Sequence, residues 1–250
     1  MTLDEKMSHL GLHFLADQLD DFLAHTAQKR HSPVQLLEQL YKLESTERAR
    51  RSLHSRLTRS KIGSFKPMSD FDWNWPKRID RTLVESTLAL DFLSENRNIV
   101  LIAAQGLGKT MLTQNIAYRA VQAGHSTLFI SAAKLLLDLA GAESARALDR
   151  RLRHYSRFQL LCIDELGYLS YDNRNADLLF EIVNRRYEKK SIVLTTNLNF
   201  SEWPSIFPNA ACTTALIDRV IHHCDIIAIE GQSYRRRDAQ ARRERQRKRS

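Results

Sequence analysis

The stretch 98–112, NIVLIAAQGLGKTML, constrains the fold of this 250-residue chain more than any other. Its apolar run, residues 99–104, predicts a short buried strand. A glycine-containing turn follows at 105–108, and a helical pattern begins at Lys109 and Thr110. A strand, a glycine-rich loop, a Lys-Thr pair and a helix in this order predict a phosphate-binding P-loop.

The chemistry of such a loop identifies the ligand. Its backbone N–H groups and the helix N-terminus surround phosphate oxygens, Lys109 reaches the β- and γ-phosphates, and the Thr110 hydroxyl binds Mg²⁺. We therefore predict ATP and Mg²⁺ as ligands. The predicted nucleotide-binding residues of the loop are Ala103, Ala104, Gln105, Gly106, Leu107, Gly108, Lys109, Thr110 and Met111.

One position departs from the pattern G-x-x-x-x-G-K-[ST], because Ala103 stands where the first glycine is expected. An alanine is penalised there only if the residue needs a positive φ. Gly106 and Gly108, the glycines nearest the phosphates, are present. We expect the change to affect nucleotide affinity and turnover, and not the location of the site.

Length and composition limit the number of domains and the cellular compartment that the sequence allows. A chain of 250 residues suits one core domain with a smaller appendage. No apolar run approaches the roughly 20 residues that span a bilayer, and the N-terminus has no signal-peptide pattern. The three cysteines, Cys162, Cys212 and Cys224, lack metal-ligand spacing. These features predict a cytoplasmic protein with reduced cysteines and no membrane partner.

The N-terminal quarter is expected to be helical. Apolar spacing predicts one helix over 3–25 and a second helix that begins with a capping box at Ser32 and continues to Ser60. The stretch 61–76 loses helical periodicity and is rich in aromatics. We therefore predict a helical N-terminal domain over 1–62, a main domain over 63–235 and a basic tail over 236–250.

The main domain alternates strands and helices. Helical patterns are predicted at 78–95, 110–123, 132–139, 143–154, 175–189 and 213–223, and strands at 99–104, 126–131, 158–163, 191–195 and 225–229. This alternation predicts an α/β fold with a parallel sheet flanked by helices on both faces. Binding groups should gather at the carboxyl ends of its strands.

Polar residues follow two of these strands. Asp164 comes after an apolar run, the pattern of a Mg²⁺-binding aspartate, and the adjacent Glu165 is placed to activate a water molecule. A strand end with acidic residues on a surface loop is the simpler alternative. Asn197 ends the next strand and is a candidate to bind the γ-phosphate or that water, or else a turn-forming asparagine.

Arg219, in ALIDRVIHH, lies in a predicted helix beside Asp218. An arginine supplied in cis or in trans accelerates phosphoryl transfer, so Arg219 is a candidate for that role. A solvated or ion-paired surface arginine is the alternative.

These residues resemble a family, the IstB-like transposition helper ATPases, a compact AAA+ group related to the DnaC-type helicase loaders. The resemblance covers nearly the whole chain. It depends on FDWNWP (71–76), GLGKT (106–110), LLCIDELGYL (160–169), LLFEIVNRRYEKKSIVLTTN (178–197), FSEW (200–203), ALIDRVIHH (215–223) and EGQSYR (230–235).

The resemblance implies roles for particular residues. Lys109 and Thr110 fall on the Walker A pair, and Asp164 and Glu165 on the Walker B pair. Asn197 falls on sensor 1, Arg219 on the arginine finger that acts on a neighbouring subunit's ATP, and Arg235 on a sensor-2-like arginine. The resemblance also implies an AAA+ domain without a full C-terminal lid, and a homo-oligomer with ATP sites between subunits.

Two further partners are implied by the resemblance, duplex DNA and a transposase. The net charge of +9 agrees with a polyanionic partner. The candidate DNA-binding residues are Arg48, Arg51, Arg56, Arg59, Lys61, Arg236 and Arg237. The basic tail is equally well described as a solvated, disordered run. The aromatics of 71–75 are candidates for packing at the domain seam, for adenine stacking or for DNA contact.

Three functions remain open at this point. The first is a DNA-stimulated ATPase that assembles on duplex DNA and regulates a transposase. The second is a DnaC-like helicase loader. The third is a DNA-binding adaptor that does not hydrolyse ATP.

Overall fold

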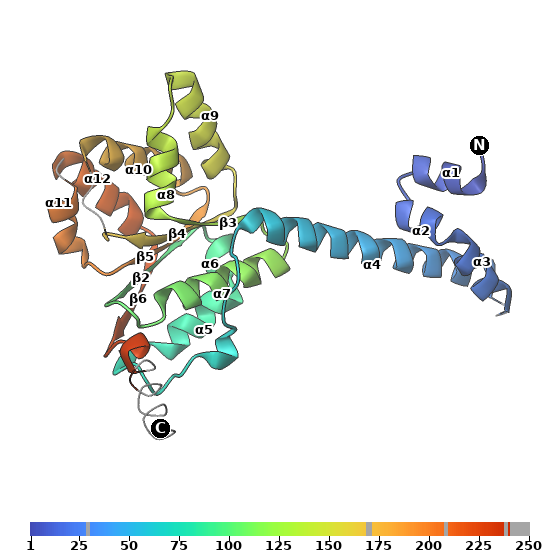
Figure 1. The fold of residues 1–250 in the computed structure, drawn as a ribbon, viewed down its shortest axis with the longest axis horizontal. Coiled ribbons are helices and arrows are strands. Elements are labelled where there is room, and N and C mark those ends of the chain that lie inside the picture. The colour runs from blue at the N-terminus through green and yellow to red at the C-terminus, as the bar shows by residue number, and fades with distance from the viewer. Residues whose placement is uncertain (29–30, 169–171, 208–209, 238–239, 241–250) are drawn as a thin grey trace, which may run out of the picture. The chain divides into compact units, whose positions relative to one another are not determined.

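The computed structural model describes residues 1–28, 31–168, 172–207, 210–237 and 240 (Figure 1). The chain divides into two compact units, Met1–Ser55 and Arg56–Ser250, and helix α4 (Pro33–Ser60) runs through the division. Among the described residues, none of the helices combines the length and the hydrophobicity that crossing a membrane requires.

The N-terminal unit contains three short helices where one was predicted: α1 (Leu3–His9), α2 (His13–Asp17) and α3 (Leu19–Gln28). The prediction of a single helix over 3–25 was wrong. Gly11 adopts φ +76°, a left-handed conformation that ends α1, and Leu12 is non-helical at the start of α2. Apolar spacing continues across this break, so it does not reveal the turn.

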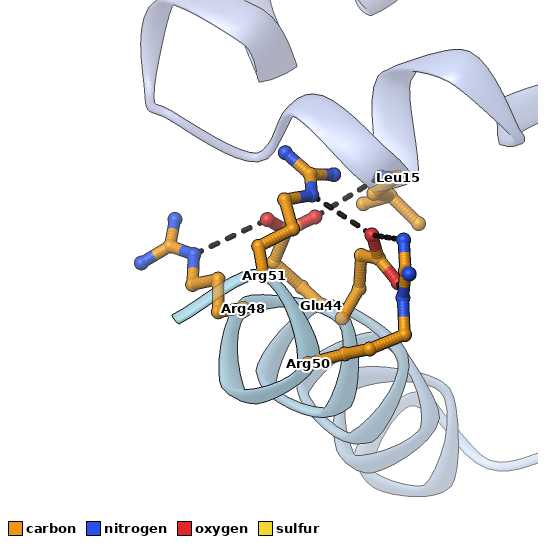
Figure 2. Close-up of polar contacts among 6 residues, drawn as sticks. Leu15, Glu44, Arg48, Arg50 and Arg51 are labelled. Atoms are coloured by element: carbon orange, nitrogen blue, oxygen red, sulfur yellow. Dashed lines mark hydrogen bonds and ion pairs between the residues drawn. The ribbon is translucent and has the colours of Figure 1, made fainter. Parts of the chain in front are cut away.

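A buried carboxylate joins these helices to α4 (Figure 2). Glu44, only 4% exposed, accepts the backbone N–H of Leu15 at 3.0 Å and the Nε–H of Arg48 at 3.2 Å. Arg48 also donates to the carbonyl of Gly11 at 2.6 Å. Burial by itself raises the pKa of Glu44, but the hydrogen bonds from Leu15 and Arg48 outweigh it and leave the pKa below its ordinary value.

Helix α4 begins as the sequence predicted. The Ser32 N–H donates to Gln35 Oε1 at 2.9 Å, and the Gln35 N–H donates to Ser32 Oγ at 3.3 Å, which is a capping box. Farther along, Glu47 pairs with Arg50 and Arg51, and their hydrogen bonds lower its pKa to about 2 (Figure 2). The Glu44–Arg48 and Glu47–Arg51 pairs are each four residues apart on α4 with the glutamate first, which is the favourable order.

The second unit is built on a six-stranded sheet in the order β1-β6-β2-β5-β4-β3. The strands are β1 (Arg78–Ile79), β2 (Asn98–Ala103), β3 (Thr127–Ser131), β4 (Leu160–Leu166), β5 (Ser191–Thr196) and β6 (Cys224–Glu230). All neighbouring pairs from β6 to β3 are parallel, which confirms the predicted parallel sheet. The short edge strand β1 runs antiparallel to β6 and was not predicted.

Helices cover both faces of this sheet (Figure 1). One face carries α7 (Lys109–Gln122) with α5 (Arg81–Ala89), and the other carries α8 (Ala132–Ala140), α10 (Asn173–Arg186) and α12 (Ala210–Ile221). The remaining helices are α6 (Asp91–Ser94), α9 (Ala145–Ser156), α11 (Trp203–Ile206), and the short 3₁₀ turns η1 (Met68–Asp70) and η2 (Phe200–Glu202). Every residue of β5 is buried, because both of its faces are covered.

The helix predicted over 78–95 was wrong at its start and is interrupted at Leu90. Arg78 and Ile79 pair with β6 instead, and Asp80 caps α5 by accepting the N–H of Leu83. Leu90, at φ +74°, ends α5 and separates it from α6. The other predicted helices and strands of this unit are present with ends shifted by a few residues.

The strand order positions the candidate site. β5 lies between β2 and β4, and the three run in the same direction. Their carboxyl ends therefore bring the P-loop, Asn197 and the Asp164–Glu165 pair to one edge of the sheet.

Candidate nucleotide site

The loop after β2 has the backbone of a phosphate-binding loop. Gly106 and Gly108 adopt φ +80° and +93°, which glycine tolerates and other residues rarely do. Ala103 is the last residue of β2 and is in strand conformation, so this position does not need glycine. Helix α7 starts directly at Lys109, and its N-terminus is aimed at the loop.

Lys109 is held inside its own loop. Its side chain is nearly buried, and Nζ donates to the carbonyls of Ala103 at 2.6 Å and Ala104 at 3.0 Å. Burial lowers the pKa of Lys109, and the positive charge of Arg235 lowers it further. The negative charges of Asp164 and Glu165 raise it, but the net shift is downward. An arriving phosphate offers this ammonium a better partner than two carbonyls.

Asp164 and Thr110 form the expected oxygen pair. The Thr110 hydroxyl lies 3.4 Å from Asp164 Oδ1, at the junction of the P-loop helix and β4. A threonine hydroxyl and a carboxylate are hard oxygen donors, the kind that Mg²⁺ prefers. The residues present therefore fit a magnesium ion.

Thr195 orients both acidic residues of the pair. Its buried hydroxyl donates to Asp164 Oδ1 at 2.6 Å and accepts the backbone N–H of Glu165 at 2.8 Å. Thr195 was not among the site residues predicted from the sequence. The available signal was a polar residue near the end of an otherwise apolar buried strand.

Glu165 adopts an uncommon backbone conformation. It has φ +64°, and the β4–β5 ladder shifts register between Ile163 and Leu166. A bulge of this kind re-aims a side chain. Here it exposes Glu165 beside the loop while its neighbours Asp164 and Leu166 stay buried.

Asn197 follows β5, the strand that lies between β2, which leads into the P-loop, and β4, which carries Asp164 and Glu165. Its Oδ1 is buried and has no hydrogen-bond partner among the residues that the structure describes. A buried acceptor without a partner is costly in a folded protein and marks a place for a ligand or a water molecule. This placement favours a binding role for Asn197 over a turn-forming one.

The loop residues 106–111 and Glu165 line a cavity of about 180 Å³, whereas Asp164, Thr195 and Asn197 are not among its lining residues. Its other lining residues come from segments that precede and follow the loop in the sequence: Lys66, Asp70, Phe71, Asp72, Trp75, Pro76, Tyr168, Tyr234 and Arg235. Pockets that hold small ligands usually measure about 300–1,000 Å³. Side chains must therefore move when a nucleotide enters, and Phe71, packed against Gly108, is the side chain nearest the loop.

The aromatic stretch 71–76 packs against the segment after β6. Trp75 Nε1 donates to the carbonyl of Gln232 at 2.7 Å, and its ring lies edge-on to Tyr234 at 6.0 Å. The Tyr234 N–H donates in turn to the Gly106 carbonyl at 2.9 Å. Trp75 thus packs inside the second unit, on one side of the cavity, and packing of these aromatics at the seam between the domains stays a prediction.

Arg219 lies away from this cavity. Its guanidinium lies over the rings of Phe180 at 4.6 Å and Tyr187 at 6.0 Å. It is near the end of α12, which leads into the amino end of β6. The P-loop lies at the carboxyl end of the strands, a strand length of roughly 20 Å away.

The candidate DNA-binding residues differ in what they contact. Arg48 and Arg51 pair with Glu44 and Glu47, Arg56 donates to the Val121 carbonyl, and Arg237 pairs with Asp72 and lies over Trp75. Arg59, Lys61 and Arg236 are exposed. The rest of the predicted basic tail, residues 238–239 and 241–250, lies outside the described residues.

The fold and the site together define the class: this is a P-loop protein of the AAA+ type. The same fold is found in DnaI, which has a TM-score of 0.54 at 19% identity and covers 69% of this chain and 90% of that one. The DnaC helicase loader has a TM-score of 0.52 at 18% identity, covering 63% and 98% of the two chains. At these identities the likeness shows the fold alone.

Sequence comparison specifies the family. The family described as IstB-like ATP binding protein matches residues 5–242, and this chain belongs to it. A relative named for ATP binding in insertion sequence IS232 of Bacillus thuringiensis subsp. berliner is 36% identical over 239 residues, covering 94% of each chain. Another, from IS21 of Pseudomonas aeruginosa, is 34% identical over 230 residues and covers 92% of this chain and 85% of its own.

Proposed function

We propose that this protein is an ATP-dependent regulator of DNA transposition, which assembles on duplex DNA, hydrolyses ATP and recruits or stimulates a partner transposase. The observation that carries the proposal is the gathering of Lys109, Thr110, Asp164, Glu165 and Asn197 at one sheet edge. In a family of insertion-sequence ATP-binding proteins, this set has the parts that phosphoryl transfer requires.

Each group has a separate task in binding. Lys109 exchanges its two loop carbonyls for the β- and γ-phosphates of ATP, and the loop N–H groups bind the other phosphate oxygens. Thr110 and Asp164 would hold Mg²⁺, which neutralises phosphate charge when bound. Thr195 fixes the Asp164 carboxylate for this task. Arg235, at the cavity rim, is placed for a phosphate contact.

Hydrolysis then needs a positioned water molecule. Asn197 and Glu165 orient it, and its oxygen bonds to the γ-phosphorus while the bond from that phosphorus to the bridging oxygen of ADP breaks. The Glu165 carboxylate takes the proton that the water gives up. The exposed position of Glu165 beside the buried Asp164 suits this division of roles.

Arg219 supports an oligomer. Since it lies at the opposite end of the strands from its own P-loop, it serves the ATP of a neighbouring copy in this proposal. The helical N-terminal domain, residues 1–62, is proposed to contact DNA, the partner or another copy, and residues 63–235 to form the ATPase domain.

DNA binding is proposed to use the phosphate backbone. Exposed basic residues such as Arg59, Lys61 and Arg236 are available for it, and the tail over 236–250 adds charge. If about six basic side chains meet phosphates, affinity falls roughly a thousandfold between low and moderate salt.

The test is ATP turnover with and without duplex DNA. We expect DNA to raise turnover, Glu165→Gln to lower it about 10²- to 10⁴-fold with ATP binding retained, and Lys109→Ala to abolish both. The exposed Glu143→Gln serves as the matched control and should behave as the wild type. Turnover that is flat with and without duplex DNA would contradict the proposal.

Two outcomes would favour one of the other two functions instead. Stimulation by single-stranded DNA only, with capture of a replicative helicase, would indicate a helicase loader. Hydrolysis that is absent from the wild type, or unaffected by Lys109→Ala, would leave a DNA-binding adaptor without ATPase activity.

A further inference from the structure

A second group of metal-ligating side chains lies at the other edge of the sheet. Glu188 is in the turn between α10 and β5, and His222 and His223 are in the turn between α12 and β6. Both turns precede parallel strands, so they meet at the amino edge, opposite the P-loop. The Asn98 N–H donates to the His223 carbonyl at 2.7 Å and fixes that turn to the start of β2.

The three side chains already have nearly the spacing of a coordination sphere. His223 Nε2 is 3.4 Å and His222 Nδ1 is 3.8 Å from Glu188 Oε1, and the three ligand atoms all lie within 4.8 Å of one another. With metal–ligand bonds of about 2.0–2.2 Å, the ligands of a tetrahedral zinc ion are roughly 3.4 Å apart. Small side-chain rotations would complete the geometry.

We propose that Glu188, His222 and His223 form a binding site for a divalent transition-metal ion, Zn²⁺ by its ligand chemistry, with the fourth position open. Two imidazoles and one carboxylate suit zinc, whereas magnesium takes oxygen ligands almost exclusively. The site is separate from the nucleotide site and does not depend on the proposed function.

The surroundings permit an ion to enter. The three side chains are 48–55% exposed, so a hydrated ion can reach them. Glu188 is held at φ +57°, an uncommon conformation for a residue with a side chain. Such conformations gather at ligand-binding positions, and this one presents the carboxylate to both imidazoles.

Two neighbouring groups affect the site without being ligands. The Tyr187 hydroxyl, 2.8 Å from His222 Nδ1, competes for that nitrogen in the absence of metal. The Cys224 thiol, next to His223, donates to the Asp225 carbonyl at 3.4 Å and is not one of the three ligands.

A bound ion would connect two turns that both lie next to elements contacting or carrying Arg219. Glu188 follows Tyr187, whose ring lies 6.0 Å from the Arg219 guanidinium, and the two histidines follow α12, the helix that carries Arg219. Binding would therefore fix the end of α12 against the start of β5 and stabilise the folded chain.

The experiment uses the full chain, treated with a chelator, kept reduced and titrated with Zn²⁺ against a chromophoric competitor. We expect one site per chain and a rise in melting temperature on adding Zn²⁺. Glu188→Gln and His223→Ala should each weaken that site at least about tenfold and remove the thermal shift. His9→Ala, an exposed histidine of α1, is the control and should bind like the wild type. Magnesium in thousandfold excess should not displace the zinc.

Several results would overturn the assignment. One is equal zinc affinity in the wild type and in Glu188→Gln. Because the Glu188 side chain is exposed, this variant should fold normally, and its circular dichroism spectrum checks that it does. Another is displacement by magnesium. Tyr187→Phe should bind zinc at least as tightly as the wild type, because it removes the competing hydroxyl, and loss of binding there would exclude the three-ligand site. Since the readouts are metal binding and melting, failure here leaves the ATPase proposal unaffected.

Discussion

The hydroxyl of Thr195 makes two contacts at once, donating to Asp164 Oδ1 and accepting the Glu165 N–H. It therefore fixes the carboxylate that is proposed to bind Mg²⁺ and, through the backbone, the bulge that exposes the carboxylate that is proposed to activate water. Valine has the same shape without the hydroxyl, so it removes these contacts and little else.

We expect Thr195→Val to lower ATP turnover about 10- to 100-fold, a typical effect of removing a group that orients a ligand, with ATP binding little changed. Steady-state hydrolysis and a nucleotide-binding titration measure the two quantities. Thr127→Val is a matched control, since Thr127 is also buried in a strand and its hydroxyl donates to the carbonyl of His125, away from the acidic pair. Equal turnover in the two variants would exclude a positioning role.

Arg186 is a fully buried cation whose partners are backbone carbonyls. Nη1 donates to Tyr155, Ser156 and Phe158, and Nη2 to Gln159 and Ser191. It ties the end of α10 to the turn between α9 and β4 and to the start of β5. Burial lowers its pKa to about 9, so it still carries its charge at neutral pH.

Arg186→Met should destabilise the fold by about 3 kcal/mol or more, because it leaves buried carbonyls without donors. Urea unfolding measures this. Arg185→Met on the same helix removes the partly exposed ion pairs with Asp149 and Glu181 and should cost no more than about 1 kcal/mol. Equal unfolding midpoints for the two variants would show that the carbonyl contacts contribute nothing.

The place of a residue that belongs to a local pattern could be predicted from the sequence, and contacts between distant segments could not. Lys109, Thr110, Asp164 and Glu165 are identified by what precedes them in the chain. Arg186 belongs to an apparently ordinary run of charged helix residues, and its buried contacts exist only once α9, β4 and β5 come together.

Among the elements, the long helices and strands were predicted and the short ones were not. The break at Gly11 is made by one left-handed residue inside continuous apolar spacing, and the two-residue strand β1 exists only because β6 lies beside it. Such elements are specified by tertiary contacts, and periodicity over a few residues carries too little information to reveal them.

The contacts of Glu44 predict a pH dependence for the N-terminal helices. Because the folded-state pKa is lowered, the carboxylate contributes stability that is complete above the unfolded value of about 4.3 and is lost as pH falls through the folded value. We expect the Leu15 amide to lose protection against hydrogen exchange over that range, as followed by NMR.

Glu44→Gln tests this dependence, since glutamine can still accept the Leu15 N–H but cannot titrate. It should remove the part of the pH dependence that Glu44 causes. The exposed Glu38→Gln on the same helix should leave it intact. An unchanged profile in Glu44→Gln would assign the acid sensitivity to other groups.

For the whole molecule, the separation of Arg219 from its own P-loop predicts complementation between subunits. Lys109→Ala and Arg219→Ala should each be inactive alone. An equal mixture should recover roughly a quarter of wild-type turnover, because random pairing places an intact lysine opposite an intact arginine that often. Arg146→Ala, an exposed arginine of α9, should remain active by itself.

A mixture without recovery would contradict sites shared between subunits, as would full activity of Arg219→Ala. The arrangement that motivates this test is the strand order, which the sequence alone does not provide. The predicted strands were correct in type, but their order along the sheet depends on which strands pair.

The contact between Gly106 and the segment after β6 restricts what can stand at position 106. A methyl group there would lie 2.2 Å from the Ser233 hydroxyl, and the Tyr234 N–H donates a hydrogen bond to the Gly106 carbonyl. A side chain at position 106 would therefore require Ser233 to move, in addition to the strain of holding φ at +80°. A substitution of Gly106 would disturb the phosphate-binding loop and the segment after β6 together.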